Sequence, residues 1–169
     1  MCKSASLNKK ATKVLSDKGF TLIELLVVIA IIGLLSTLAI VALNIARGKS
    51  RDTKRVADMK QVQKALELFY ADNLSYPTVA APVALGTGTV LSLCGSGFAA
   101  TCAGTNYMVS LPQAPSIVES GCTAGNNAYS YSSGATSGVS ATYAITFCLG
   151  SRVGELGAGL RTASQNGMQ

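Results

Sequence analysis

The dominant feature of the hydrophobic pattern is one apolar run near the start of the chain. No charged residue occurs between Leu25 and Leu43. As a helix this run spans roughly 28 Å, close to the hydrocarbon thickness of a bilayer, about 30 Å. A secretory signal peptide has a shorter apolar region of about 7–15 residues, followed by a small-residue cleavage site. The run therefore predicts a membrane-spanning helix over residues 20–43.

Between residues 44 and 75 the pattern becomes amphipathic. Apolar residues recur at spacings of three and four, which places them on one stripe of a helix where a head domain packs. The stripe consists of Val56, Met59, Val62, Leu66, Phe69 and Tyr70. The other faces are assigned the charged residues Arg47, Lys49, Arg51, Asp52, Lys54, Arg55, Asp58, Lys60, Lys64 and Glu67. Tyr76-Pro77 closes the helix, because a residue before proline is biased away from helical conformation.

Residues 76–169 predict a small β head. Val139, Ala141, Tyr143, Ile145, Phe147 and Leu149 alternate with small or polar residues and predict a strand with one apolar face. A shorter strand is expected at 128–131 before a turn-rich 132–138, and a third at 107–111. Residues 77–105 predict a surface loop, and the glycine-rich tail from Gly150 either forms an edge strand or covers the head. The fold class is α+β, a long N-terminal helix packed on a small antiparallel sheet.

The cysteines predict two disulfides in the head. Of five cysteines, four lie there, at Cys94, Cys102, Cys122 and Cys148. They form no CxxC pair and the chain has no histidine, so a zinc site would need all four thiolates at unusual spacing. Two bridges in an oxidising compartment are preferred, with no metal and no cofactor. Cys94 and Cys102 enclose a short loop, and folding residues 132–138 about Ala135 sets Cys122 opposite Cys148.

Glu24 is a carboxylate one turn inside the apolar helix. Such a group costs on the order of 2–3 kcal/mol in a bilayer and normally has a partner. Its position alone leaves open that it stays hydrated at the membrane interface. The residues around it are Lys18-Gly19-Phe20-Thr21-Leu22-Ile23-Glu24-Leu25-Leu26. They resemble the N-terminal signal of type IV prepilins and type II secretion pseudopilins, in which a basic leader ends in Gly before Phe, with Glu at the fifth mature position.

This resemblance implies a processing and assembly route. Residues 1–19 form a leader, and a prepilin peptidase cuts after Gly19 on the cytoplasmic side of the membrane and methylates the new amine at Phe20. Glu24 then meets the amine of a neighbouring subunit, so Phe20 and Glu24 are assembly residues and not catalytic ones. The implied partners are identical subunits in a homo-polymer, the inner-membrane assembly platform and the assembly ATPase.

The same resemblance implies a place in the cell. The precursor spans the membrane once, with its leader cytoplasmic and its head extracytoplasmic, and the mature form lies in a surface filament or a periplasmic pseudopilus. Many family members carry a proline at the position of Val41. A proline-induced break is therefore not expected at this point.

The net charge of +6 is uneven. Residues 1–19 contain five lysines and one aspartate, so cleavage removes much of the excess. The basic cluster Arg47–Arg55 is a solvated helix face, or it contacts anionic lipid headgroups, acidic residues of neighbouring subunits or nucleic acid. No aromatic residues are interleaved for base stacking, which disfavours nucleic acid as a partner.

The residues favour a structural role over an enzyme. The head has no histidine, no paired carboxylates and no phosphate-binding loop. Three candidates remain: a subunit of a type IV pilus-like filament, a pseudopilin of type II secretion, and a membrane-anchored extracytoplasmic binding domain. Major pseudopilins of the family bind calcium through acidic residues in a C-terminal loop. Beyond Asp72 this chain offers Glu119 and Glu155, too few for a cage of six to eight oxygens, which favours a disulfide-closed pilin.

Overall fold

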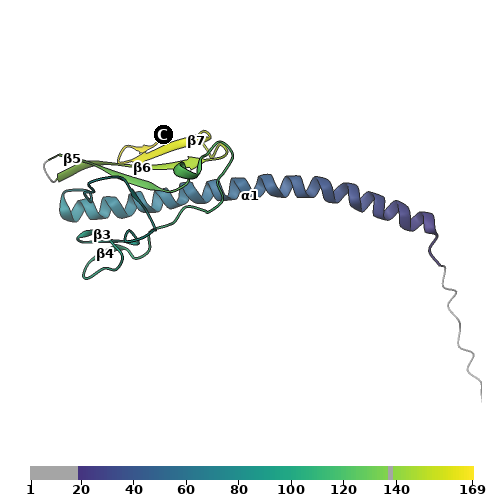
Figure 1. Cartoon of the computed structure of the whole chain (residues 1–169), viewed down its shortest axis with the longest axis horizontal. Helices are drawn as coiled ribbons and strands as arrows, with labels where there is room; N and C mark the ends of the chain where they lie inside the picture. Colours follow the sequence, from purple (N-terminus) through teal and green to yellow (C-terminus); the bar gives the residue numbers. More distant parts are fainter. Residues whose placement is uncertain (1–18, 137–138) are drawn as a thin grey trace, which may run out of the picture. The chain divides into compact units, whose positions relative to one another are not determined.

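The structure is a computed structural model that describes residues 19–136 and 139–169, so residues 1–18 of the expected leader lie outside it. The chain divides into two compact units, Met1–Val41 and Ala42–Gln169. One helix, α1 (Leu22–Asn73), contributes to both (Figure 1). All strands belong to the second unit, which is the head together with the second part of α1. The predicted α+β class is confirmed.

The C-terminal end of α1 is set by its own backbone. Leu74 adopts a left-handed φ of 53°, the conformation in which helices commonly terminate. Its N–H still donates to the carbonyl of Tyr70 at 2.8 Å, so the last turn stays closed. The helix therefore ends ahead of Tyr76-Pro77.

The larger sheet has five antiparallel strands in the order β1-β5-β6-β7-β8. Their bounds are β1 (Val83–Ala84), β5 (Ser130–Thr136), β6 (Val139–Leu149), β7 (Gly159–Ser164) and β8 (Gly167–Met168). The tail that follows Gly150 thus supplies two strands at one edge, the first of the two alternatives that the sequence left open. A short 3-10 helix, η1 (Ala124–Asn126), precedes β5.

Two expectations for this sheet were wrong. Strand β5 continues to Thr136, where a turn-rich segment was predicted, and it pairs Ser130 with Thr146. The alternation in β6 holds from Tyr143 to Phe147, and Cys148 is buried as well as Leu149. At the other end of the strand Val139 is exposed while Ser140 is buried. A register shift between Ser133 and Ala135, opposite this end of β6, accompanies the change of face.

A second, three-stranded sheet has the order β3-β2-β4. It comprises β2 (Ser92–Cys94), β3 (Gly97–Ala99) and β4 (Asn106–Met108). The prediction of a surface loop for residues 77–105 was wrong here, because all three residues of β2 are buried and Leu93 enters the core. Part of the expected strand at 107–111 does form, but it joins this sheet and not the larger one.

The core of the head lies where α1 meets both sheets. The predicted stripe is confirmed, since Met59, Val62, Leu66 and Phe69 are buried and Val56 and Tyr70 pack against them. The sheets contribute Leu85, Leu93, Tyr129, Tyr131, Tyr143, Ile145, Phe147 and Leu149. Each fully buried side chain of this size stabilises the head by roughly 1.5–3 kcal/mol.

Candidate functional site

The N-terminal end of α1 carries the residues of the expected cut site. Gly19 and Phe20 precede the helix and both are exposed. The hydroxyl of Thr21 accepts a hydrogen bond from the backbone N–H of Glu24 at 3.3 Å, so Thr21 caps the helix. Capping places Glu24 in the first turn, where the helix dipole favours a negative charge.

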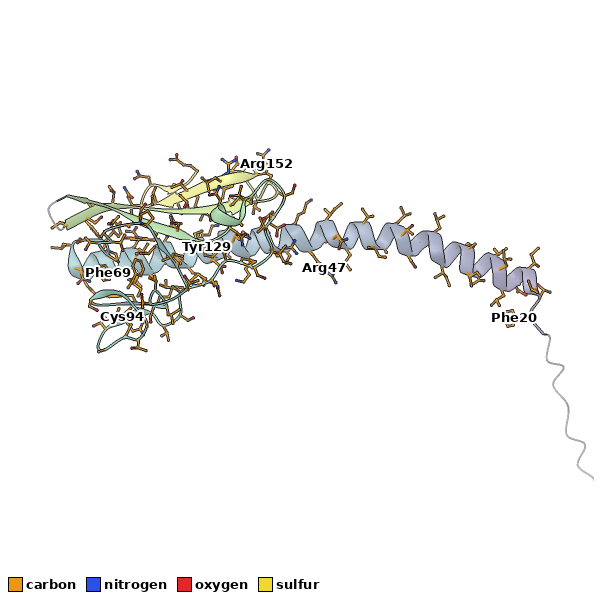
Figure 2. The ribbon with its side chains drawn as sticks, viewed as in Figure 1. Phe20, Arg47, Phe69, Cys94, Tyr129 and Arg152 are labelled. Carbon is orange, nitrogen blue, oxygen red and sulfur yellow. A yellow bond between two sulfur atoms is a disulfide. The ribbon has the colours of Figure 1, made fainter. Side chains whose placement is uncertain are left out.

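The segment that follows exposes apolar side chains on every face. All residues from Phe20 to Arg47 are exposed, and an 18-residue window of α1 has a mean hydropathy of 3.0 with none of it buried. By length and composition this is the one helix in the described part of the chain that is suited to crossing a membrane. Figure 2 shows these side chains pointing outward along α1 ahead of Arg47. A monomer in water would not keep such a surface uncovered.

Helix α1 runs through Val41 without a break, in agreement with the absence of proline there. The hydroxyl of Thr37 donates to the carbonyl of Leu34 at 2.8 Å, which satisfies this polar side chain inside the helix. Gly33 has no neighbour within 4 Å that a side chain would touch.

Three charged residues of the second half of α1 contradict the prediction that charge lies on the outer faces. Asp52, Arg55 and Asp58 are 1%, 0% and 7% exposed. They continue the buried stripe toward the N-terminus, because positions 52, 55 and 59 follow the same spacing of three and four. The spacing of these residues was visible in the sequence. A search for apolar residues at helical spacing misses it, because charged residues are not expected in the interior.

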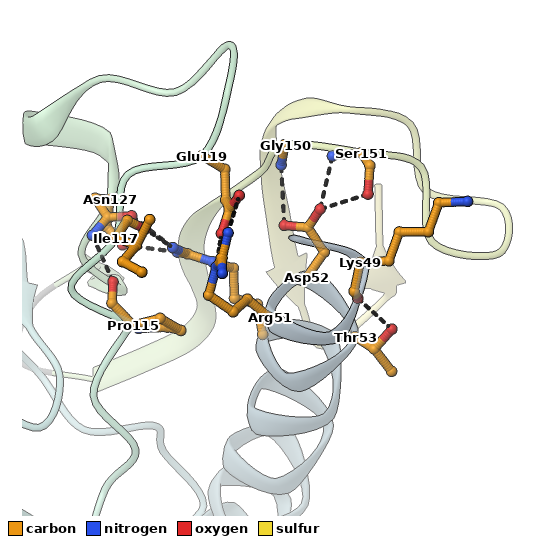
Figure 3. A network of polar contacts seen from close by, with 11 residues as sticks. Lys49, Arg51, Asp52, Thr53, Pro115, Ile117, Glu119, Asn127, Gly150 and Ser151 are labelled. Carbon is orange, nitrogen blue, oxygen red and sulfur yellow. Dashed lines mark hydrogen bonds and ion pairs between the residues drawn. The ribbon is translucent and has the colours of Figure 1, made fainter. Parts of the chain in front are cut away.

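Asp52 binds the loop that follows β6. Its carboxylate accepts the backbone N–H of Gly150 at 3.1 Å and that of Ser151 at 2.8 Å, and the hydroxyl of Ser151 adds a third bond at 2.7 Å (Figure 3). Hydrogen bonds to a charged acceptor are roughly twice as strong as neutral ones. The buried carboxylate is therefore well compensated.

Arg51 and Arg55 bind the segment before β5. Arg51 pairs with Glu119 through two nitrogens, and this hydrogen bond is the main reason why the pKa of Arg51 is raised. Arg55 donates to the side-chain and backbone oxygens of Asn127 at 2.6 and 3.1 Å, and to the carbonyl of Ile117 at 3.3 Å. Two neighbouring turns of α1 thus hold two loops of the head (Figure 3).

Asp58 completes this polar row one turn further along. It accepts from the hydroxyl of Tyr129 at 2.9 Å and from the ammonium of Lys54 at 3.1 Å. Burial and, after it, the bond to Asp58 raise the pKa of Tyr129 well above its usual range. Tyr129 therefore stays neutral and keeps donating across the physiological range of pH.

Both disulfides join the pairs that the sequence predicts. Cys94, at the end of β2, is bridged to Cys102 in the segment between β3 and β4, and Cys122 is bridged to Cys148. The argument for the second pair needs correction, because Cys122 lies in a loop before η1 and not on a strand opposite β6. All four thiols are consumed, which removes the zinc ligands that the sequence offered.

The N-terminal part of the chain is similar to known proteins. Residues 15–40 match the family described as the prokaryotic N-terminal methylation motif. The type II secretion system core protein G of Klebsiella michiganensis is 40% identical over 63 residues, 37% of this chain and 44% of that protein. Its counterpart in Escherichia coli is 41% identical over 62 residues, 37% of this chain and 43% of that protein.

A pilus protein is also similar. The type IV wide pilus major component PilA4 of Thermus thermophilus is 46% identical over 70 residues, 41% of this chain and 53% of that protein. The chain thus spans about half of the length of these relatives, or less. No solved structure matches the chain.

Proposed function

We propose that this chain, which carries the N-terminal signal of the type IV pilin and pseudopilin family, is a structural subunit of a type IV pilus-like filament. A prepilin peptidase cleaves it after Gly19 and methylates the amine of Phe20. The mature helix, residues 20–43, leaves the bilayer to enter the core of the filament. The relatives are named as secretion and pilus components, which supports a structural role and not an enzyme.

The observation that carries this proposal is the junction between Gly19 and Phe20 directly ahead of a capped apolar helix. A Cβ on Gly19 would meet no described atom within 4 Å, so packing among the described residues does not require glycine there. A protease cleft that admits a backbone with almost no side chain would require glycine at this position. The match to the methylation motif over residues 15–40 spans this junction.

Glu24 supplies the assembly contact in this proposal. It is exposed on α1, and no cation of residues 19–136 or 139–169 forms an ion pair with it. Cleavage creates an ammonium at Phe20. In the filament the carboxylate of an incoming subunit meets the ammonium of a subunit already in place. Two unpaired charges in lipid become one pair, which relieves part of their desolvation cost.

The other partners follow from the same proposal. The membrane holds the precursor through residues 20–43, with the leader in the cytoplasm and the disulfide-closed head, residues 76–169, outside it. The amphipathic segment, residues 44–75, packs against the head. An inner-membrane platform and an assembly ATPase drive polymerisation of identical subunits.

A type II secretion pseudopilin is the second candidate, and the names of the relatives support it equally. The small number of acidic residues in the head favours a pilus. Glu119 is occupied by Arg51, and Glu155 alone cannot supply the calcium cage that the resemblance leads us to expect in a major pseudopilin. A membrane-anchored binding domain is the third candidate, and it leaves Gly19-Phe20 without a role.

Electron microscopy of material sheared from the cell surface separates the first two candidates. Filaments labelled by an antibody to the head support the pilus. A matured chain that stays in the cell envelope, with no labelled surface filament, favours the pseudopilus. The matched control is the Glu24→Val variant expressed together with the normal subunit. The variant should be processed normally, but less of it should be incorporated into filaments.

A further inference from the structure

The loop before β5 and the start of the amphipathic segment expose apolar side chains close together. Ile45, Ile117 and Val118 are 58%, 55% and 42% exposed. Arg55 holds the backbone of Ile117 against α1, and Arg51 holds Glu119, the residue after Val118. The two isoleucine-containing segments are therefore fixed beside each other and are not free to bury their side chains elsewhere in the head.

Exposed cations occur near these apolar side chains. Arg47, Lys49 and Arg152 are all exposed. Lys49 and Ile45 share the lining of a cavity of about 260 Å³ with Glu119, Ser120, Gly150 and Ser151, and Arg152 is the next residue along. We call the set Ile45, Arg47, Lys49, Ile117, Val118 and Arg152 the basic rim.

The neighbouring acidic residues do not neutralise the basic rim. Asp52 is 1% exposed and bonded to Gly150 and Ser151, and Glu119 is 9% exposed and paired with Arg51. Glu155, the next acidic residue after Arg152, lies with Lys60 along a different groove. The fold thus places acidic groups inside and leaves basic ones outside at this surface.

We propose that the basic rim binds the surface of an anionic lipid bilayer. Arg47 lies four residues beyond Leu43, so chain connectivity alone keeps it within about 14 Å of the end of an apolar run anchored in the bilayer. Cations near an anionic leaflet strengthen binding by about fivefold each, and exposed apolar side chains beside them enter the interface. The inference rests only on the membrane anchorage in the proposed function. The bound head would be the state of the subunit before it enters a filament.

Fluorescence quenching of the full chain tests this proposal, because the chain has no tryptophan. Val118→Trp adds a single reporter at the rim. Val109→Trp adds a matched one on an exposed site beside β4, whose Tyr107 contacts Asp72, about 38 Å along α1 from Arg47. Each variant is placed, one chain per particle, in lipid nanodiscs of phosphatidylcholine that contain brominated phosphatidylglycerol or brominated phosphatidylcholine.

We expect the brominated anionic lipid to quench the indole of Val118→Trp at least about twofold more than the brominated neutral lipid does. The indole of Val109→Trp should be quenched by neither. Adding Arg47→Gln and Lys49→Gln, or raising the salt to about 1 M, should remove the difference. The control pair Lys60→Gln and Lys64→Gln should leave it unchanged.

Equal quenching at the two reporters, or quenching that ignores lipid charge, would overturn the proposal. Hydrogen exchange of residues 115–121 in the chain without substitutions guards against a perturbation by the new indole, and it should slow only with the anionic lipid. If hydrogen exchange slows only when a particle holds more than one chain, the basic rim would instead be a contact between subunits. A single chain per particle cannot polymerise, so a failure here leaves the filament proposal standing.

Discussion

Asp52 on α1 accepts hydrogen bonds from the backbone N–H groups of both Gly150 and Ser151, in the loop that follows β6. Cys148 lies at the end of β6, two residues before Gly150, and is bridged to Cys122. The carbonyl of Glu119 accepts from the N–H of Cys122 at 3.0 Å. Through Glu119, the neighbouring Arg51 therefore holds the other side of the disulfide. Two consecutive helix residues and one disulfide thus close a ring that fixes the head on α1.

The first prediction concerns the acidic member of this ring. Asp52→Asn keeps the shape of the side chain but turns an amide N–H toward backbone donors, and we expect a loss of about 2–3 kcal/mol of unfolding free energy. Urea unfolding of the full chain in detergent, followed by near-ultraviolet circular dichroism, measures it. Exposed Glu155→Gln is the matched control, within about 0.5 kcal/mol of the parent. A loss no larger than that of the control would contradict the role of Asp52.

Arg55 gives a second prediction. An ammonium is a single point charge and cannot reach the oxygens of both Ile117 and Asn127 as the guanidinium fork does. We expect Arg55→Lys to cost about 2–3 kcal/mol of unfolding free energy and to speed hydrogen exchange in residues 115–121. Arg47→Lys, on an exposed turn of the same helix, should change neither quantity. Unchanged exchange in Arg55→Lys would show that the loop holds its place without the guanidinium.

The two disulfides should differ in what they contribute. Their sequence separations are 26 residues for Cys122–Cys148 and 8 for Cys94–Cys102. On the chain-entropy relation, replacing Cys122 and Cys148 by serine should cost about 3.5 kcal/mol of unfolding free energy. Replacing Cys94 and Cys102 by serine should cost about 2.6 kcal/mol. The longer bridge also belongs to the ring at α1, so its loss should also loosen the loop that contains Glu119, residues 115–121. Unfolding of the two double variants measures the difference, and a reversed order would contradict this account.

Alkaline pH should weaken the head. Burial raises the pKa of Tyr143 to about 12, and Gln63 lies close but makes no well-formed hydrogen bond with this hydroxyl. The unfolded chain releases the proton near pH 10 and the folded chain does not. The contribution of each such tyrosine to stability should be level below pH 10 and fall above it by about 1.4 kcal/mol per pH unit.

Tyr143→Phe tests the assignment directly. The buried hydroxyl of Tyr143 has no hydrogen-bond partner in the described part of the chain, so its removal should be close to neutral at pH 7. Between pH 10 and 12 the unfolding free energy of Tyr143→Phe should fall less steeply with pH than that of the parent, by the contribution of one tyrosine. Half-buried Tyr107, whose hydroxyl donates to Asp72, is the comparison site. An unchanged alkaline slope in Tyr143→Phe would contradict the assignment.

The sequence predicted those parts of the fold that follow from local periodicity. The stripe from Met59 to Phe69 repeats every three or four residues and is buried, and the alternation from Tyr143 to Phe147 forms one buried face of β6. The register of β5 could not be predicted in this way. A shift between Ser133 and Ala135 is decided by pairing across the sheet, which no single strand records.

The polar contacts that fix the head escaped prediction for a related reason. Asp52 and Arg55 look like solvated residues because charged side chains are seldom buried without partners. Most of their partners are backbone groups, those of Gly150, Ser151, Ile117 and Asn127, and a backbone group carries no mark in the sequence. The pairing of Glu119 with Arg51 likewise depends on where the loop lies in the fold, because 68 residues separate the two in the sequence.

The apolar helix invites a further prediction about processing. A side chain at residue 19 would obstruct a cleft that admits only glycine, so Gly19→Val should leave a full-length membrane protein. Gly33→Val is the matched control, because it too replaces an exposed glycine with free space around it, and it should be cleaved normally. Immunoblotting of membrane fractions distinguishes the two sizes. Mature subunits from Gly19→Val would contradict the assigned site.

The most direct test of the central claim is mass spectrometry of the intact subunit purified from the envelope or from sheared filaments. Our account predicts a chain that begins at Phe20, carries one methyl group on its amine and contains two disulfides. A subunit that still carries residues 1–19, or that begins at another residue, would contradict it.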